Sequence, residues 1–304
     1  MRPIGRIVGR VLIAAGLAYA AGPSPSGRER AQADPSAVVT FVGAGDIANC
    51  DHLSPARSTA KLLDSIQGTI FTLGDHAYKR GDAQELHDCY GSTWGRYKDR
   101  TRPAIGNHDT RTANGQPYFD YFGERAGPDR RGYYSFDLGA WHIVSLNSEA
   151  SITRASPQMQ WLREDLATHP SECTLAYWHV PLFASGAGAE PGLAQLWRVL
   201  YAAGVDVVLN GHVHVYERFA PQDDQGHADP ARGIREFIVG TGGGELESIK
   251  HPAPNSEVRN DRTFGVLKLT LSPHGYEWEF VPIAGQRFRD RGTSACSPLT
   301  VPAG

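Results

Sequence analysis

The sequence has no excess of basic residues. Its 30 Lys and Arg against 33 Asp and Glu give a formal net charge of -3, and no block of like charges occurs along the chain. A chain without a basic patch or stripe argues against nucleic acid or an anionic membrane as the partner. An acidic substrate must therefore be held by local chemistry and not by the overall charge of the protein.

Long apolar runs are also missing. The N-terminal run VLIAAGLAYAAG, from Val11, is shorter than the roughly 20 residues that span a bilayer. Three arginines precede it, the small-residue site Ala18-Tyr19-Ala20 lies near its end, and a second such site, Ala31-Gln32-Ala33, follows it. This order is typical of a secretory signal peptide over residues 1–33, with a retained anchor as the alternative. We predict a secreted or periplasmic protein without a stable membrane anchor.

Cysteine is scarce, with four in the chain. Their spacing matches no zinc ribbon, and export favours two disulfide bonds, which four cysteines can form in three ways. Cys50 and Cys89 each follow closely a segment in which an apolar run ends in a Gly-Asp pair. We therefore favour the pairs Cys50–Cys89 and Cys173–Cys296, with free buried thiols as the alternative.

Four apolar runs each end in a small polar pair: VVTFVGAGD, TIFTLGD, RPAIGNHD and VDVVLNGH. Strands that are apolar throughout are buried on both faces, and α/β enzymes place their chemistry in the loops after such strands. Helical patterns cover 54–66, 156–169 and 191–204, the first two with expected serine caps, and hairpin patterns cover 133–147 and 264–283. We predict an α/β (α+β) fold, with two mixed sheets packed face to face between helices.

Each polar strand end is weak evidence when it is taken alone. A lone Asp after Gly usually caps a turn, and a lone histidine on an apolar strand, such as His179, is usually a satisfied core residue. The pair His212 and His214 is stronger evidence, because the period of two along a strand places both rings on one side.

Taken in order, the polar segments resemble the calcineurin-like metallophosphoesterases, and within them the purple acid phosphatases and related bacterial phosphatases. The segments are GDIA (45–48), GDHAY (74–78), GNHD (106–109), WH (178–179) and GHVH (211–214). The resemblance implies a single catalytic domain over residues 34–304 with a four-layer αββα sandwich. It also implies a secreted phosphatase with two metal ions, which hydrolyses phosphate monoesters by attack of a metal-bound hydroxide.

The resemblance assigns two groups of metal ligands that share one carboxylate. Asp46, Asp75, Tyr78 and His214 belong to the first metal, and Asp75, Asn107, His179 and His212 belong to the second. These residue types suit hard or borderline cations, whereas a soft-metal site would contain thiolates. A bridging carboxylate is needed between two ions roughly 3.5 to 4 Å apart, and Asp75 is the natural bridge.

Tyr78 distinguishes the purple acid phosphatase pattern, because Ala48 stands where the wider family has a histidine. A phenol with an ordinary pKa of about 10 binds as phenolate only beside a strongly polarising ion. We therefore expect Fe(III) at the first position. The ligands of the second position suit Fe(II), Zn and Mn equally well, so the second ion is expected to be one of these three.

His108 matches the family's proton donor to the leaving group. Imidazole suits this role because its pKa lies near the operating pH, and we expect Asp109 to orient the ring. His76, inside GDHAY, is unusual for the family; we favour an exposed loop residue over a contact with the site or substrate. The family often carries histidines that hold the substrate phosphate soon after WH, but the segment 180–196 contains none.

Other motifs carry less weight. GTGGGE at 240–245 lacks the Lys and Ser or Thr of a P-loop, so we expect a tight turn near the site. Tyr216, Glu217 and Arg218 follow GHVH and are expected to support the structure. The sequence contains no Gly-x-Ser-x-Gly turn, which argues against a serine hydrolase of that type.

Two alternatives remain. One is a phosphodiesterase or nucleotide hydrolase that uses the same pair of metals, and the other is a non-catalytic metal-binding module on the same fold. The presence of all the expected ligands together with His108 favours an enzyme. Its expected partner is a small phosphorylated substrate.

Overall fold

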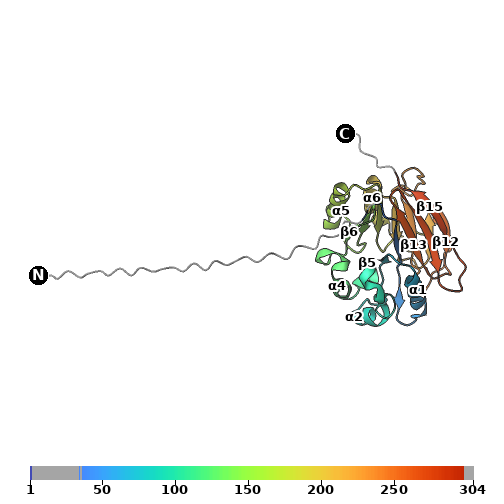
Figure 1. Cartoon of the computed structure of the whole chain (residues 1–304), viewed down its shortest axis with the longest axis horizontal. Coiled ribbons are helices and arrows are strands. Elements are labelled where there is room, and N and C mark those ends of the chain that lie inside the picture. The colour runs from blue at the N-terminus through green and yellow to red at the C-terminus, as the bar shows by residue number, and fades with distance from the viewer. Residues whose placement is uncertain (2–33, 35, 298–304) are drawn as a thin grey trace. The chain divides into compact units, whose positions relative to one another are not determined.

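A computed structural model describes Met1, Asp34 and residues 36–297 (Figure 1). The predicted signal peptide therefore lies outside the described residues, apart from Met1. In the part of the chain that is described, no helix combines the length and the apolar character needed to cross a bilayer.

The first sheet has six strands in the order β15-β14-β13-β1-β3-β5. Three are neighbouring parallel strands: β1 (Val39–Ala44), β3 (Thr69–Leu73) and β5 (Thr101–Ala104). The other three are antiparallel to their neighbours: β13 (Gly265–Ser272), β14 (Gly275–Pro282) and β15 (Arg291–Ala295). The parallel strands end at the same edge of the sheet.

The second sheet has seven strands in the order β12-β10-β11-β9-β8-β7-β6. Its four parallel strands are β7 (Trp141–Ser145), β8 (Cys173–Tyr177), β9 (Val207–Asn210) and β11 (Arg235–Val239). Its antiparallel strands are β6 (Tyr134–Leu138), β10 (Tyr216–Phe219) and β12 (Ser256–Asn260). A separate ribbon pairs β2 (Ala48–Asn49) with β4 (Ala77–Tyr78).

The two sheets pack face to face through aromatic side chains. Phe41 of β1 lies 4.8 Å from Phe71 of β3 and 5.8 Å from Tyr177 of β8, measured between ring centroids. All three rings are fully buried. Burying such a side chain stabilises the fold by about 1.5 to 3 kcal/mol, so these contacts fix the sheets against each other.

Helices cover the outer faces of both sheets and complete the predicted four-layer sandwich (Figure 1). Helix α1 (Ser54–Ser65) packs against β13, whereas α5 (Pro157–Thr168) and α6 (Ala194–Ala202) share a buried cluster with β8 and β9. The shorter α-helices are α2 (Ala83–Glu85), α3 (Asn107–Thr110) and α4 (Gln116–Phe122). Short helices of other types are η1 (Leu86–Tyr90), η2 (Trp94–Arg100), η3 (Ala113–Gly115), η4 (Gly123–Ala126), η5 (Pro128–Arg130) and η6 (Pro191–Leu193).

The three predicted long helices and both hairpins are confirmed, with two local differences. Ser156 caps α5 by accepting from the Met159 N–H, but Ser54 is the first residue of α1 and not its cap. The segment that begins at Pro191 starts as the 3-10 turn η6 and becomes α-helical at Ala194. Proline favours a first turn in both α1 and η6, because its missing N–H would have no partner there.

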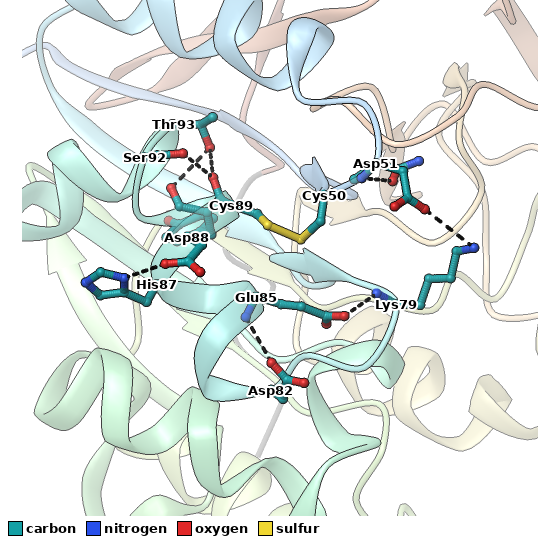
Figure 2. The surroundings of a disulfide bond; sticks show 12 residues. Cys50, Asp51, Lys79, Asp82, Glu85, His87, Asp88, Cys89, Ser92 and Thr93 are labelled. Carbon is teal, nitrogen blue, oxygen red and sulfur yellow. Dashed lines mark hydrogen bonds and ion pairs between the residues drawn. A yellow bond between two sulfur atoms is a disulfide. The ribbon is translucent and has the colours of Figure 1, made fainter.

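Both favoured disulfide bonds are present. Cys50 pairs with Cys89, which ties the segment after β2 to η1 (Figure 2). Cys173 opens β8 of the second sheet, and its partner Cys296 directly follows β15 of the first. One bond therefore braces the small β2–β4 ribbon, and the other joins the two sheets.

Candidate metal centre

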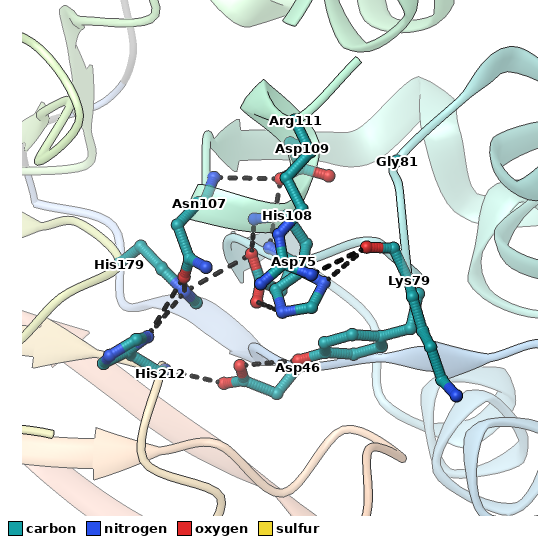
Figure 3. Close-up of polar contacts among 12 residues, drawn as sticks. Asp46, Asp75, Lys79, Gly81, Asn107, His108, Asp109, Arg111, His179 and His212 are labelled. Carbon is teal, nitrogen blue, oxygen red and sulfur yellow. Dashed lines mark hydrogen bonds and ion pairs between the residues drawn. The ribbon is translucent and has the colours of Figure 1, made fainter. Parts of the chain in front are cut away.

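The polar strand ends converge at one edge of the sandwich. The loops that meet there follow β1, β3 and β5 of the first sheet and β8 and β9 of the second (Figure 3). The loops carry Asp46 after β1, Asp75 after β3, Asn107 after β5, His179 after β8, and His212 and His214 after β9. Tyr78 comes from β4 of the small ribbon. The structure thus brings together all seven predicted metal ligands.

Three of these residues have left-handed backbone conformations. Asp46, Asp75 and His212 have φ angles of 59°, 51° and 68°. Residues other than glycine adopt this region at a cost of order 1 to 3 kcal/mol, and such residues cluster at functional sites. Hydrogen bonds between the loops stabilise the turns, including Asp46 N–H to Gly74 O at 3.1 Å.

One group of donors consists of Asp46, Tyr78 and His214. The Tyr78 hydroxyl lies 2.8 Å from Asp46 Oδ1 and 3.0 Å from His214 Nε2, and His214 Nε2 lies 3.3 Å from Asp46 Oδ1. His214 Nδ1 donates to the carbonyl of Glu245 at 2.6 Å. Because a carbonyl only accepts, that bond fixes the ring with Nε2 turned into the group.

The second group consists of Asn107, His179 and His212, whose side chains point toward one another in Figure 3. Asn107 Oδ1 lies 2.9 Å from His179 Nε2 and 3.1 Å from His212 Nδ1, and the two ring nitrogens are 3.3 Å apart. The other nitrogen of His179 donates to the Leu73 carbonyl at 2.6 Å. His179 is therefore oriented in the same way as His214.

Asp75 lies between the two groups. Its Oδ1 is 3.3 Å from His179 Nε2, and donor atoms of Asp75, Asp46 and His179 all lie within 4.8 Å of one another. The backbone N–H of His108 donates to the same Oδ1 at 2.8 Å. Asp75 is thus placed to serve both groups.

The donors fit two metal ions. Two donors that each lie about 2.0 to 2.1 Å from one ion are separated by about 2.9 to 3.4 Å, depending on the coordination angle. The distances within the groups, 2.8 to 3.3 Å and 2.9 to 3.3 Å, agree with that range to within 0.1 Å. Carboxylate, phenol, amide and imidazole donors also suit iron, zinc and manganese.

Burial and neighbouring charges shift the pKa values of several of these side chains. Burial alone would lower the pKa of His179, but the charge of Asp75 outweighs it and raises the pKa to about 10. Asp46 and the Glu245 carbonyl likewise overcome the effect of burial and raise the pKa of His214 to about 9. Burial and the same two carboxylates raise the pKa of Tyr78 well above its ordinary value. Metal ions must displace the protons that these groups hold.

His108 lies beside the centre, where the prediction placed it. Its Nδ1 donates to the Lys79 carbonyl at 2.8 Å, and its Nε2 lies 3.9 Å from Asp75 Oδ2. The side chain is 18% exposed, so the ring borders both the carboxylate and solvent. Nε2 is the nitrogen available for exchanging a proton at the centre.

Asp109 does not orient His108 as expected. Its buried carboxylate accepts hydrogen bonds from the backbone N–H groups of Asp75, His76 and Gly106 at 2.9 to 3.1 Å. The Lys79 carbonyl, not Asp109, holds the His108 ring. The structure therefore corrects this assignment: Asp109 holds the backbone around Asp75.

His76 is not the exposed loop residue that we favoured. It is fully buried, with Nδ1 2.9 Å from Asp109 Oδ2 and Nε2 2.7 Å from Thr72 Oγ1. Its ring packs against Tyr90, Tyr118 and Phe122. The His76 side chain thus ties Asp109 to β3.

The glycine-rich segment 240–245, for which a tight turn was expected, is a bend that passes close to the centre. A Cβ atom on Gly244 would lie 2.9 Å from His214 Cε1, and one on Gly240 would lie 2.9 Å from Asp46 Oδ2. Glycine is required here because the backbone passes directly beside two of the donors. The sequence did not reveal that the Glu245 carbonyl orients His214.

Comparison with known proteins identifies the family. Residues 29–216 match the calcineurin-like phosphoesterase family, and this range covers more than half of the chain. The chain belongs to this family. The family implies a binuclear metal site, in agreement with two donor groups that share Asp75.

Relatives of this calcineurin-like phosphoesterase include several purple acid phosphatases. Purple acid phosphatase 18 of Arabidopsis thaliana is 28% identical over 268 residues, 78% of this chain and 58% of the relative. Purple acid phosphatase 22 of the same plant is 37% identical over 151 residues, 46% of this chain and 34% of the relative. The match thus covers little more than half of the length of the first relative and about a third of the length of the second.

Solved structures confirm the fold. The purple acid phosphatase PPD1 from yellow lupin has a TM-score of 0.70 at 21% identity, covering 86% of this chain and 54% of that chain. GAP50 of Plasmodium has a TM-score of 0.63 at 15% identity, covering 86% of this chain and 89% of that one. The calcineurin-like fold is therefore shared with proteins that differ widely in sequence.

The raised histidine pKa values predict how pH affects the stability of the chelated protein. His179 and His214 gain protons on folding at any pH between the ordinary histidine pKa, about 6.5, and their folded values of about 10 and about 9. Their stabilisation is complete below about pH 6.5 and is lost as the pH rises through those values. We expect the free energy of unfolding to fall by an amount of order a few kcal/mol between pH 7 and 10.

Urea unfolding at several pH values, in the presence of chelator, measures this dependence. Asp75→Asn removes the charge that raises the His179 pKa. The free energy of unfolding of this variant should therefore fall less between pH 7 and 10 than that of the wild type. A wild-type protein whose stability is constant or rises toward pH 10 contradicts the electrostatic account of the centre.

Proposed function

We propose that the protein is a secreted phosphatase that hydrolyses phosphate monoesters with the aid of two metal ions. The observation that carries the proposal is the pair of donor groups that share Asp75, with His108 Nε2 3.9 Å from Asp75 Oδ2. The purple acid phosphatase names of its relatives support this activity. Two disulfide bonds support an oxidising compartment and hence export.

The donor sets support an assignment of the metals. We place Fe(III) with Asp46, Tyr78 and His214, because burial and nearby carboxylates keep the Tyr78 phenol protonated unless a strongly polarising ion binds it. Fe(II), Zn or Mn would be held by Asn107, His179 and His212, and Asp75 would serve both ions, since it lies between the two donor groups. When bound, two such ions polarise a phosphoryl group and lower the pKa of coordinated water toward about 7.

The protein's own contribution to bond cleavage is the proton that His108 supplies. Its Nδ1–H is engaged by the Lys79 carbonyl, so the second proton of the imidazolium resides on Nε2, the nitrogen that faces Asp75. Transfer of that proton to the leaving oxygen prevents the release of an unstable alkoxide. The Lys79 carbonyl determines which nitrogen takes part.

Replacing His108 tests this role. We expect His108→Ala to lower kcat by about 10²- to 10⁴-fold, because the leaving group loses its proton donor. The metal content should stay the same, since His108 is not a proposed ligand. The loss should be smaller for para-nitrophenyl phosphate, whose leaving group is stable as an anion, than for an alkyl phosphate.

Kinetic assays and elemental analysis of the same preparations check both expectations. The matched control is His87→Ala, which removes an exposed histidine that pairs with Asp88. Equal loss of metal and activity in His108→Ala contradicts the assignment. Wild-type preference for the bis(para-nitrophenyl) ester over the monoester contradicts monoester specificity and favours the phosphodiesterase alternative.

Arg111 is the residue that we propose for holding the anionic substrate. It lies three positions after His108, and its Nη1 donates to the same Lys79 carbonyl at 3.1 Å (Figure 3). The shared acceptor keeps the guanidinium beside the proton donor. Arginine binds phosphate oxygens through a planar set of N–H donors. We therefore propose that Arg111 takes the place of the phosphate-binding histidines that the segment 180–196 lacks.

We expect Arg111→Gln to raise KM for a phosphate monoester by about tenfold, since one charge-assisted hydrogen bond contributes about 1.5 to 3 kcal/mol. The value of kcat should change much less, because His108 keeps its own bond to Lys79. Steady-state kinetics of Arg111→Gln and of the control Arg57→Gln, which alters an exposed arginine of α1, measure the effect. An unchanged KM in Arg111→Gln would show that the substrate is held elsewhere.

A further inference from the structure

A second cluster of metal-type donors lies far from the metal centre. It consists of His142 on β7 together with Asp165 and His169 at the end of α5. His142 pairs in register with Thr174 on β8, whereas His179 of the metal centre lies five residues farther along. At about 3.3 Å per residue, the two places are on the order of 16 Å apart along the strand direction.

The distances within this cluster suit one metal ion. His142 Nε2 lies 2.9 Å from Asp165 Oδ2, and His169 Nδ1 lies 3.4 Å from Asp165 Oδ1. One donor atom from each residue lies within 4.8 Å of the others, the same limit that Asp46, Asp75 and His179 satisfy. The two distances to Asp165, 2.9 and 3.4 Å, agree with the separation expected for donors about 2.0 to 2.1 Å from one zinc ion.

The surrounding structure orients two of the donors. His142 Nδ1 lies 3.0 Å from Asp137 Oδ1, its cross-strand partner on β6, which leaves Nε2 directed at Asp165. A carboxylate on the second nitrogen of a histidine is the arrangement that commonly fixes zinc-binding imidazoles. Ser135 Oγ donates to Asp165 Oδ1 at 2.7 Å and holds that carboxylate.

His169 provides the accessible side of the cluster. It lies four residues after Asp165, so both side chains occupy the same face of the last turn of α5. Its ring is parallel to that of His142, with 5.1 Å between centroids and an angle of 5°. The His169 side chain is 52% exposed, whereas His142 and Asp165 are buried. His169 Nδ1 also lies 2.9 Å from the backbone carbonyl of Asp165, so this ring must release that hydrogen bond to bind a cation that enters from solvent.

We propose that His142, Asp165 and His169 bind a zinc ion separate from the catalytic pair, with solvent as the fourth ligand. Two imidazoles and one carboxylate are a common protein ligand set for zinc. The ion would join the end of α5 to the β6–β7 hairpin, because its ligands come from both. This site does not depend on the proposed phosphatase activity.

Counting bound zinc in the full chain, with the catalytic metals in place, tests the proposal. The probe is ZnCl2, followed by equilibrium dialysis and elemental analysis. We expect His169→Ala to bind about one zinc ion fewer per chain than the wild type, and to lose the zinc-dependent rise in Tm. Circular dichroism checks that the variant is folded, independently of any activity.

His227→Ala is the matched control. His227 is also exposed and also lies four residues after a carboxylate, Asp223, but it belongs to a loop. It should keep the wild-type zinc count. An equal zinc count in the wild type and His169→Ala overturns the proposal, as does an equal loss in the two histidine variants.

His212→Ala separates this site from the metal centre. It should reduce the metal of the catalytic pair and leave the zinc at His169 unchanged. The His169→Ala and His212→Ala changes should add in the double variant, because sites this far apart act independently. If the single variant His212→Ala also lost the zinc ion assigned to His142, Asp165 and His169, the proposal would be overturned.

Discussion

The metal centre depends on the buried turn that presents Asp75. The carboxylate of Asp75 lies between two groups of donors, and its backbone has a φ of 51° that costs free energy. Asp109 holds this turn by accepting from the N–H groups of Asp75 and His76, and also from Gly106 on the neighbouring loop. A Cβ on Gly106 would lie 2.3 Å from Asp75 Oδ1, so this close approach requires glycine.

The same turn connects the core of the first sheet to His108, the proposed proton donor. His76 joins Asp109 to Thr72 within β3, and the His108 backbone N–H donates to Asp75. Hydrogen bonds between buried polar groups therefore link the core to the proposed metal ligand Asp75 and the proposed proton donor His108. Such networks specify a single geometry, because a buried polar group that loses its partner is costly.

Much of the fold could be predicted because strands and their ends are local features. Apolar runs that end in Gly-Asp or Gly-His pairs identified β1, β3 and β9, and the order of the segments identified the donors. The ribbon of β2 and β4 was not predicted, since each of its strands has only two residues and no periodic pattern. The roles of Asp109 and His76 were also not predicted, because they depend on contacts between segments 33 residues apart in the sequence.

The central claim is that Tyr78 binds a ferric ion within a two-metal centre, and a ferric phenolate absorbs visible light. Protein purified without chelators should contain about two metal ions per chain, including iron, and should be coloured. Tyr78→Phe removes only the hydroxyl that lies 2.8 Å from Asp46, so it should abolish the visible absorption. Elemental analysis and absorption spectra of the two proteins provide the most direct test. A colourless, iron-free wild-type protein, or a Tyr78→Phe variant that keeps the colour, would contradict this account.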